Sequence, residues 1–210
     1  MEDILDIYAQ DIDPERPRLC FDERPCLLID NVVAPLPMKE GKAKRIDYEY
    51  TRTGTAVVLL AYNMDTGQRH TLVSDTKNKI DYANFIAYVL DTHYAQVKGI
   101  HLIQDNLNTH TKGSFYKAFD PIKARKYAQK LEFHFTPKHG SWLNMAEIEF
   151  SALSRQCLNR RFDAVDTMAK QIKAWEIDRN RKAIKIHWSF TVNNAHEKLA
   201  RHYYEVFNQY

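Results

Sequence analysis

A strand hairpin followed by a crossover helix constrains the fold of this chain more than any other feature of its sequence. Residues 55–62 are β-branched and apolar, as in a buried strand, and a turn follows them. Residues 68–74 alternate in polarity, which predicts a second strand paired back on the first. Residues 78–93 repeat their apolar side chains with helical spacing, and a short strand is expected at 100–104. Together these elements predict a mixed sheet with helices on its faces.

The flanking segments complete an α/β pattern of five strands. A strand is expected at 19–26, with Cys20 and Asp22 on one face and with its ladder interrupted at Pro25. The other expected elements are a helix at 3–9, a loop at 30–46, one or two helices at 110–130, a strand at 131–135, a loop at 136–143, and helices at 144–158, 166–179 and near 194–208. Ligands of such sheets gather at the carboxyl ends of strands, and Asp105 stands at one of these ends.

Composition excludes several classes of protein. The 210 residues include 12 Tyr, 10 Phe and 3 Trp, enough for a sizeable core, which argues against wholesale disorder. No apolar run reaches the roughly 20 residues that span a bilayer, so no membrane association is expected. The N-terminus is acidic, unlike a signal peptide. The three cysteines form no Cys-x-x-Cys pair, so they indicate neither a disulfide framework nor a cysteine zinc site, and a reducing intracellular compartment is expected.

The distribution of charge says more than the net charge of +3. Residues 1–24 carry a net charge of −5, whereas residues 112–138 and 151–187 each carry +5. The two basic stretches flank a segment, 139–150, whose only charges besides a histidine are two glutamates. Solvated helix faces explain any one such run. Bases that bracket isolated acids are also what an enzyme acting on phosphodiesters needs, because the bases hold the backbone and the acids hold metal.

Three acids are candidate functional groups, and each has a structural alternative. Asp22 lies within a predicted strand, where an exposed edge would accommodate it equally well. Asp105 ends a strand, where aspartate often bonds the following backbone amides. Glu147 stands three residues after Asn144, the spacing of a capping box that would only begin a helix. Glu149 is two positions further and points about 200° around the helix, so only one of these two glutamates faces a given site.

The functional interpretation joins the three acids. Carboxylates from two neighbouring strands and one helix would converge at one end of the sheet. Such hard oxygen ligands suit Mg²⁺ or Mn²⁺, not zinc. Two such ions, about 3.5–4 Å apart, activate an attacking oxygen and stabilise the leaving oxygen at a phosphodiester.

Three ordered sequence blocks resemble the catalytic signature of IS630-type transposases of the Tc1/mariner group. They are Cys-Phe-Asp22-Glu-Arg-Pro, Gln-Asp105-Asn-Leu-Asn-Thr-His110, and Thr136-Pro-Lys-His-Gly-Ser-Trp-Leu-Asn-Met-Ala-Glu147-Ile-Glu-Phe-Ser. The resemblance extends from about residue 1 to the Trp188-Ser-Phe-Thr segment, and it is most specific over residues 131–161. It implies an RNase H-like DDE domain, an α/β fold with a mixed five-stranded sheet flanked by helices.

The resemblance also implies a domain organisation. Residues 1–18 would form an N-terminal helix and connector, and residues 19–185 the RNase H-like DDE catalytic core. Residues 186–210 would form a C-terminal helical tail packed on that core. Relatives usually carry a helix-turn-helix region ahead of the core, which the 21 residues before Asp22 are too few and too acidic to provide. We therefore expect that region to be encoded separately or to lie outside this chain.

The resemblance assigns the catalytic and metal-binding roles to Asp22, Asp105 and Glu147. Leu143-Asn-Met-Ala-Glu147 matches the family's Leu-Asn-x-x-Glu, which favours Glu147 over Glu149. Asp105 and Glu147 are 42 positions apart, a longer interval than in the usual Tc1 pattern, and the basic segment 112–130 fits this extra length. The ligands would hold Mg²⁺ or Mn²⁺, with two ions expected.

Further residues are expected to support catalysis or to contact DNA. Asn106 and His139 would orient groups in the site, although an ordinary structural or solvated role is the commoner one for a single histidine. The expected DNA contacts are Lys138, Trp142, Arg155, Arg160 and Arg161, with salt-sensitive, sequence-independent contacts from the arginines. Trp142 would stack on a distorted base or else plug its loop into the core.

The implied activity is cut-and-paste transposition. The enzyme would cleave DNA at element ends and join the freed 3′-OH to target DNA at a TA dinucleotide. A homodimer assembled on transposon ends and target DNA, in the nucleoid of a bacterial cytoplasm, is expected from the family. Three alternatives remain: an RNase H-like nuclease or resolvase without strand transfer, a non-catalytic DNA-binding transposase derivative, and a small-molecule metal hydrolase. The three intact acids oppose the second, and the basic stretches oppose the third.

Overall fold

The computed structural model describes residues 1–201 and 203. Its strands form one mixed sheet in the order β3-β2-β1-β4-β5, in which β1 pairs antiparallel with β2 and parallel with β4. The strands are β1 (Arg18–Asn31), β2 (Tyr50–Asn63), β3 (Arg69–Ser74), β4 (Ile100–Gln104) and β5 (Leu131–Phe135). The predicted hairpin, crossover and mixed five-stranded sheet are therefore confirmed.

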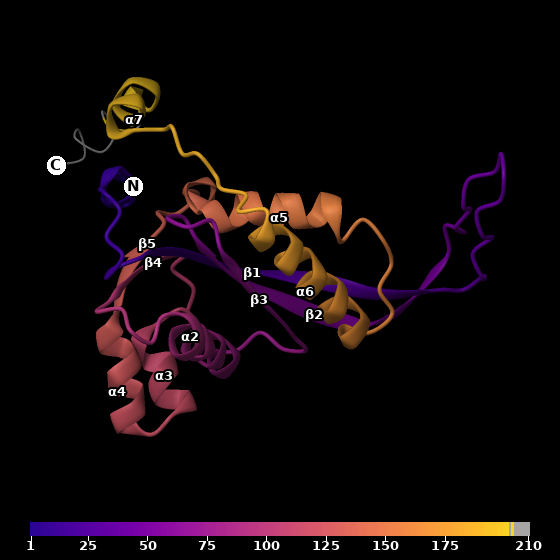
Figure 1. Cartoon of the computed structure of the whole chain (residues 1–210), viewed down its shortest axis with the longest axis horizontal. Helices are drawn as coiled ribbons and strands as arrows, with labels where there is room; N and C mark the ends of the chain where they lie inside the picture. Colours follow the sequence, from indigo (N-terminus) through magenta and orange to yellow (C-terminus); the bar gives the residue numbers. More distant parts are fainter. Residues whose placement is uncertain (202, 204–210) are drawn as a thin grey trace.

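Helices cover both faces of this sheet (Figure 1). Alternate residues of a strand face opposite sides, so Leu19 and Phe21 enter one core and Cys20 enters the other. The first core lies under α2 (Lys79–His93), α3 (Lys112–Ala118) and α4 (Pro121–Lys130). The second core lies under α1 (Glu2–Ala9), α5 (Met145–Gln156), α6 (Val165–Arg181) and α7 (Val192–Lys198).

Local capping signals fix where several helices begin. Asn78 caps α2 through a complete capping box with Asp81. Asp120 accepts hydrogen bonds from the amides of Ile122 and Lys123, and Pro121 occupies the first position of α4. The basic segment 110–130 is therefore two helices, because the Asp-Pro pair ends one and begins the next.

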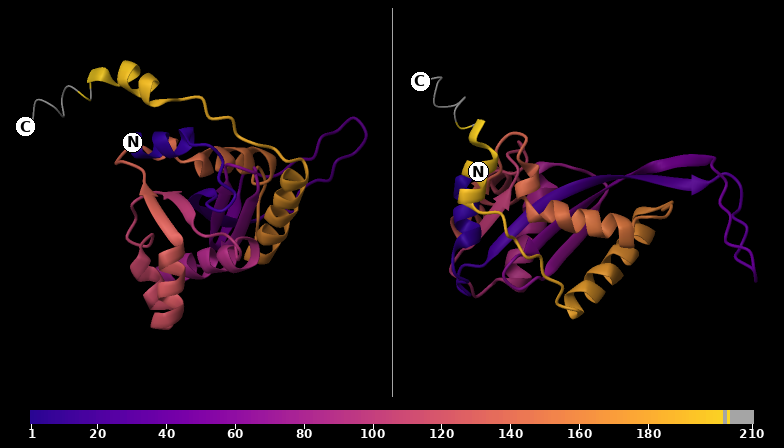
Figure 2. Two further views of the ribbon diagram at one scale, coloured as in Figure 1. Left: turned by 60° about the vertical axis from the view of Figure 1, so that its left-hand side comes forward. Right: turned by 90° about the horizontal axis from the view of Figure 1, so that it is seen from above.

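The loop expected at 30–46 is instead a projecting arm (Figures 1 and 2). β1 and β2 continue past the body, and residues 32–49 extend beyond them with isolated bridges between Leu36 and Arg45 and between Lys39 and Lys42. The expected break at Pro25 was wrong, because the β1–β2 register runs through Pro25 and shifts only at Leu28/Ile29. β1 has no β4 partner beyond Cys20, so the missing amide of Pro25 is tolerated at an open edge.

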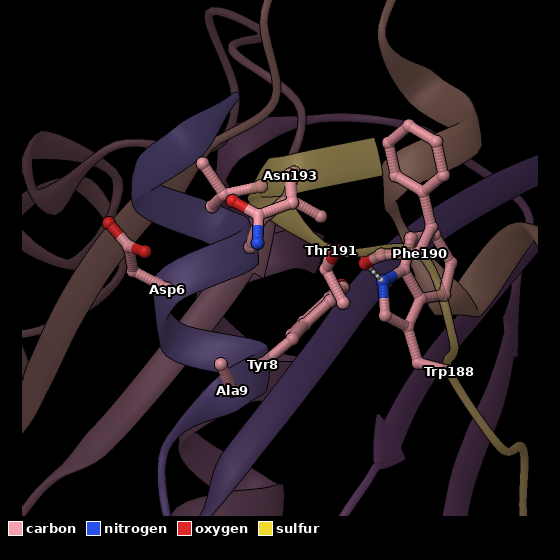
Figure 3. Close-up of a pocket in the computed structure, with 9 residues that line it drawn as sticks. Asp6, Tyr8, Ala9, Trp188, Phe190, Thr191 and Asn193 are labelled. Atoms are coloured by element: carbon pink, nitrogen blue, oxygen red, sulfur yellow. Dashed lines mark hydrogen bonds between the residues drawn. The ribbon is translucent and has the colours of Figure 1, made fainter. Parts of the chain in front are cut away.

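The C-terminal segment returns across α1. Trp188 meets Tyr8 edge to face at 5.2 Å between ring centroids, and its indole nitrogen donates to the Phe190 carbonyl at 2.7 Å (Figure 3). The last predicted helix begins at Val192, slightly before its expected start, and part of its expected length lies outside the described residues. Among the residues that the structure describes, no helix is long and apolar enough to cross a membrane.

Candidate active site

The register of two parallel strands places Asp22 beside Asp105. Cys20 on β1 pairs with Ile103 on β4, and each aspartate comes two residues later. Asp22 lies on the face of β1 that Cys20 turns toward α5, and Asp105 is the first residue after the end of β4. The β1–β4 ladder stops at Cys20, and the two strands part at the point where the acids stand.

Asp22 stands just past the end of the β1–β4 ladder, but its side chain is buried, so it does not lie on the solvated edge that was its structural alternative. Its residue is only 8% exposed, and burial raises the pKa of its carboxyl to about 7. The negative charges of Glu147 and Asp105 contribute to this raised pKa, so the three acids share one electrostatic environment. Burial disfavours the charged form of this carboxyl. A bound cation would stabilise the carboxylate and so lower its pKa.

Glu147 lies in the first turn of α5 with its side chain exposed. Asn144 caps this helix by accepting from the amide of Ala146, and the described structure has no reciprocal bond from Glu147. The carboxylate of Glu147 is therefore free of the capping role that the spacing allowed. The helix N-terminus, with its partial positive charge, favours the anionic form at this position.

Glu149 points into the core, as its offset from Glu147 predicts. It is fully buried and forms ion pairs with Arg69 at 2.6 Å and Arg179 at 3.0 Å. These pairs join β3, α5 and α6, so Glu149 belongs to the scaffold and Glu147 faces the site.

Asn144 joins the glutamate-bearing helix to the aspartate-bearing strand. Its side-chain amide donates to the Phe21 carbonyl at 2.8 Å and approaches Asp22 Oδ2 at 3.4 Å. One buried side chain therefore sets the start of α5 and its distance from β1.

Asp105 contacts a buried network of charged side chains that was not predicted from the sequence. His110 forms an ion pair with Asp105 through Nδ1, and its Nε2 lies 3.3 Å from Glu23, which also pairs with Lys77 at 2.8 Å. Burial alone would lower the pKa of His110, but its contacts with Asp105 and Glu23 raise it to about 9. The only sequence signal was that Glu23 and His110 stand inside the two aspartate motifs.

Lys138 and His139 are exposed in the loop between β5 and α5. His139 adopts a left-handed φ of 64°. At Gly140, an added Cβ would lie 2.6 Å from Pro137 Cγ, so the turn requires glycine. Trp142 is 44% exposed and its ring lies parallel to that of Trp188 at 6.4 Å, so it is partly anchored and partly open to solvent.

The expected DNA-contacting arginines differ in their surroundings. Arg155 is exposed at the end of α5, and Arg160 is exposed with one hydrogen bond to Gln171 at 3.3 Å. The guanidinium of Arg161, in contrast, is used within the chain. It donates to Asn31 and to the backbone carbonyls of residues 47–49. Arg161 therefore holds the base of the arm, and Asn106 is exposed next to Asp105.

The donor set fits a hard divalent cation. Among the described residues, no lysine, arginine or histidine lies within 4.0 Å of the carboxylates of Asp22 or Glu147, so their negative charge is not balanced within the protein. In the described part of the chain, the only group of three such side chains whose ligand atoms all lie within 4.8 Å of one another is His101, Glu132 and His134. The three acids do not form such a group. All three candidate ligands offer oxygen, as Mg²⁺ and Mn²⁺ prefer.

Comparison with solved structures confirms the fold. The Mos1 mariner paired-end complex with Mn has a TM-score of 0.55 and 14% identity, over 87% of this chain and 55% of that one. The Mos1 strand transfer complex has a TM-score of 0.56 and 12% identity, over 87% of this chain and 54% of that one. The chain thus spans about half the length of these transposases, and their likeness matches the expected RNase H-like sheet.

Sequence comparison identifies the family. No curated protein sequence matches the chain. The sequence model described as DDE superfamily endonuclease matches residues 17–169, a span that includes Asp22, Asp105 and Glu147. Because this match covers more than half of the 210 residues, the chain belongs to the DDE superfamily endonucleases.

Proposed function

We propose that this chain is the catalytic domain of a DNA transposase of the IS630 type. It cleaves DNA strands at element ends and transfers the freed 3′-OH into target DNA. The observation that supports this proposal is that the β1–β4 ladder ends two residues before Asp22 and Asp105, and that the charges of Asp105 and Glu147 both raise the pKa of Asp22. The three sequence blocks that resemble IS630-type transposases support the subtype.

In this proposal Asp22, Asp105 and Glu147 hold two divalent ions, Mg²⁺ or Mn²⁺. Such ions, when bound, lower the pKa of a water or 3′-OH and stabilise the leaving oxygen. The number of two ions follows from the family resemblance and from the all-oxygen donor set. The other residues orient this set: His110 fixes the carboxylate of Asp105, and Asn144 fixes α5 against β1.

The surroundings of the site provide DNA contacts. Lys138 and His139 would contact the phosphates next to the scissile bond, and Asn106 would orient Asp105 or the nucleophile. Trp142 presents its open face for stacking on an unpaired base. Arg155 and Arg160 are exposed and available for phosphate contacts.

Assembly on DNA as a homodimer is part of the same proposal. The solved neighbours include transposon end complexes and a strand transfer complex of Mos1. The arm of residues 32–49 exposes apolar side chains far from the body, among them Val33, Leu36, Met38 and Tyr48. Exposed apolar groups of this kind indicate contact with another macromolecule. We further propose that the chain acts on the nucleoid of a bacterial cytoplasm, as the IS630 resemblance implies.

The test is a two-stage reaction on supercoiled plasmid in Mn²⁺ or Mg²⁺. The first stage measures nicking by the wild type, by Asp105→Asn and by a matched control, Asp166→Asn, which changes an exposed acid of α6 outside the site. The second stage supplies labelled DNA with a free 3′-OH, and sequences the joined products for insertion at TA.

We expect metal-dependent nicking and joined products with the wild type and the control, and neither with Asp105→Asn. Nicking without joined products would assign a nuclease or resolvase activity instead of transposition. Nicking that Asp105→Asn retains would place the chemistry elsewhere. If the wild type binds DNA but cleaves none in either metal, even when fused to a helix-turn-helix domain, the catalytic assignment is wrong.

A further inference from the structure

A second set of metal-ligand side chains lies on β4 and β5, away from the three carboxylates. His101 pairs in register with Glu132, and Ile103 pairs with His134. The two histidines therefore share the face of the sheet that carries α1, whose Asp3 contacts His134. His101 precedes Asp105 by four positions, about 13 Å at the usual rise of a strand, so this cluster is distinct from the candidate active site.

The spacing of the ligand atoms matches tetrahedral coordination. His101 Nδ1 lies 3.1 Å from His134 Nε2 and 3.5 Å from Glu132 Oε2, and His134 Nε2 lies 3.9 Å from Glu132 Oε1. Ligands bound to zinc at about 2.0–2.1 Å in a tetrahedron lie about 3.4 Å from one another. The three separations bracket that value, with the two Glu132 distances measured to different oxygens, so one ion would fit once the exposed Glu132 carboxylate turns a single oxygen toward both histidines.

A carboxylate on the far side of the His134 ring favours the tautomer that can bind a metal through Nε2. Asp3 of α1 accepts from His134 Nδ1, with Oδ2 at 2.9 Å. This contact keeps the proton on Nδ1 and leaves the lone pair of Nε2 facing His101. Carboxylates behind metal-bound histidines commonly have this role, which orients the ring and raises its basicity.

The chemistry of the set selects the ion. Two imidazole nitrogens and one carboxylate suit a borderline transition-metal ion, whereas Mg²⁺ and Mn²⁺ prefer oxygen. Both histidines are mostly buried, and Glu132 is half exposed, so a water molecule can complete the fourth position.

We propose that His101, Glu132 and His134 bind one Zn²⁺, which fastens β4 to β5 and, through Asp3, to α1. The ion holds the N-terminal helix against the parallel edge of the sheet. Binding moves the proton of His101 from Nδ1 to Nε2, because Nδ1 becomes a ligand.

The competing arrangement is a hydrogen-bonded chain without metal. In it His101 Nδ1–H donates to His134 Nε2, and Glu132 pairs with Arg16 at 3.6 Å, an exposed contact that contributes little. The two arrangements differ in zinc content and in the effect of zinc on unfolding, and both are measurable.

The experiment uses the full chain with Asp22→Asn, Asp105→Asn and Glu147→Gln, so that the candidate active site takes up no metal. This parent is stripped with a chelator, incubated with Zn²⁺, and its bound zinc is measured by mass spectrometry. Co²⁺ is then substituted, because tetrahedral Co²⁺ gives intense visible absorption. His101→Gln, His134→Gln and Glu132→Gln are compared with a control, His187→Gln, which changes an exposed histidine outside the cluster.

We expect one zinc per chain in the parent and the control, a raised unfolding temperature with zinc, and a tetrahedral Co²⁺ spectrum. Each histidine variant should lose the ion, and Asp3→Asn should weaken binding roughly 10- to 100-fold, as for other carboxylates behind metal ligands. Glu132→Gln is the variant that keeps the test decisive if a histidine variant fails to fold, since Glu132 is half exposed. A parent that takes up no zinc, or equal zinc in parent and Glu132→Gln, overturns the proposal.

Discussion

At the scale of single residues, two glutamates two positions apart differ completely in their exposure to solvent. Glu147 is exposed at the start of α5, and Glu149 is buried between Arg69 and Arg179. Helical geometry requires this division, because side chains two positions apart point to nearly opposite sides. The same substitution at each position should therefore give different results.

We expect Glu147→Gln to remove cleavage activity and leave stability nearly unchanged. Activity should fall at least about 100-fold, since even the outer partners of metal ligands cost 10- to 100-fold. Glu149→Gln should lower the free energy of unfolding by about 3 kcal/mol, because Arg69 and Arg179 would be left buried without their counterion. Nicking rates and thermal unfolding of the two variants check this, and equal destabilisation by both would contradict the division.

A buried histidine predicts loss of stability in mild acid. His70 on β3 stacks on His93 at 4.0 Å and contacts the Tyr94 hydroxyl at 3.2 Å. Burial, with the nearby charges of His93 and Lys173, lowers its pKa from 6.5 to about 3. Between these values the unfolded chain binds a proton that the folded chain does not, so stability is lost as the pH falls through 6.5 toward 3.

This contribution should amount to about 2–3 kcal/mol between pH 7 and pH 4.5. Unfolding by urea at both pH values measures it in the wild type and in His70→Gln, which removes the titrating ring. We expect a flatter pH dependence in His70→Gln and an unchanged one in His187→Gln, an exposed control. An identical pH dependence in all three proteins would show that His70 does not contribute.

At the scale of elements, the arm depends on one side chain from outside it. Arg161 follows α5 in the chain and donates to the backbone carbonyls of Asp47, Tyr48 and Glu49. The arm itself has two isolated bridges and buries little apolar surface. Its orientation relative to the body is therefore set by contacts at its base.

We expect Arg161→Ala to loosen the arm without unfolding the body. The arm carries Lys39, Lys42, Lys44 and Arg45, so limited trypsin digestion reports its mobility. Cleavage within residues 39–45 should accelerate several-fold in Arg161→Ala and stay at the wild-type rate in Arg160→Ala, a neighbouring exposed arginine. Equal cleavage of all three proteins would mean that the arm is held by other contacts.

At the scale of the whole molecule, charge is separated along the chain. The N-terminal 24 residues carry −5, and the two basic stretches carry +5 each. The proposed DNA-binding surface therefore gains affinity by displacing counterions from DNA phosphates. Individual arginines add to this effect without reading sequence.

We expect DNA affinity to fall steeply with salt, and the slope to report the phosphate contacts. Arg155→Ala and Arg160→Ala should each weaken binding for all sequences and reduce the slope of log K against log salt by about 1. Fluorescence anisotropy at 50 to 300 mM KCl measures the affinity and its slope. This range includes physiological salt, ~150 mM. Arg161→Ala is the comparison, since its guanidinium is already used within the chain, and an equal slope change there would revise its assignment.

The sequence by itself determined the order and kind of the elements. Apolar periodicity fixed the hairpin, the strands at 100–104 and 131–135, and the crossover helix, because burial of one face is a local property of the pattern. The sequence also supplied the three acids, since their motifs resemble a known family. The Asp120-Pro121 pair marked the helix boundary between α3 and α4 through local capping chemistry alone.

Only the tertiary structure decided which groups meet. The pairing of Cys20 with Ile103 brings Asp22 to Asp105, and neither residue carries a local sign of the other. The chain from Asp105 through His110 to Glu23, and the cluster of His101 with His134, join residues of different strands and loops. Strand register and helix docking create these contacts through long-range packing, which periodicity along the chain does not encode.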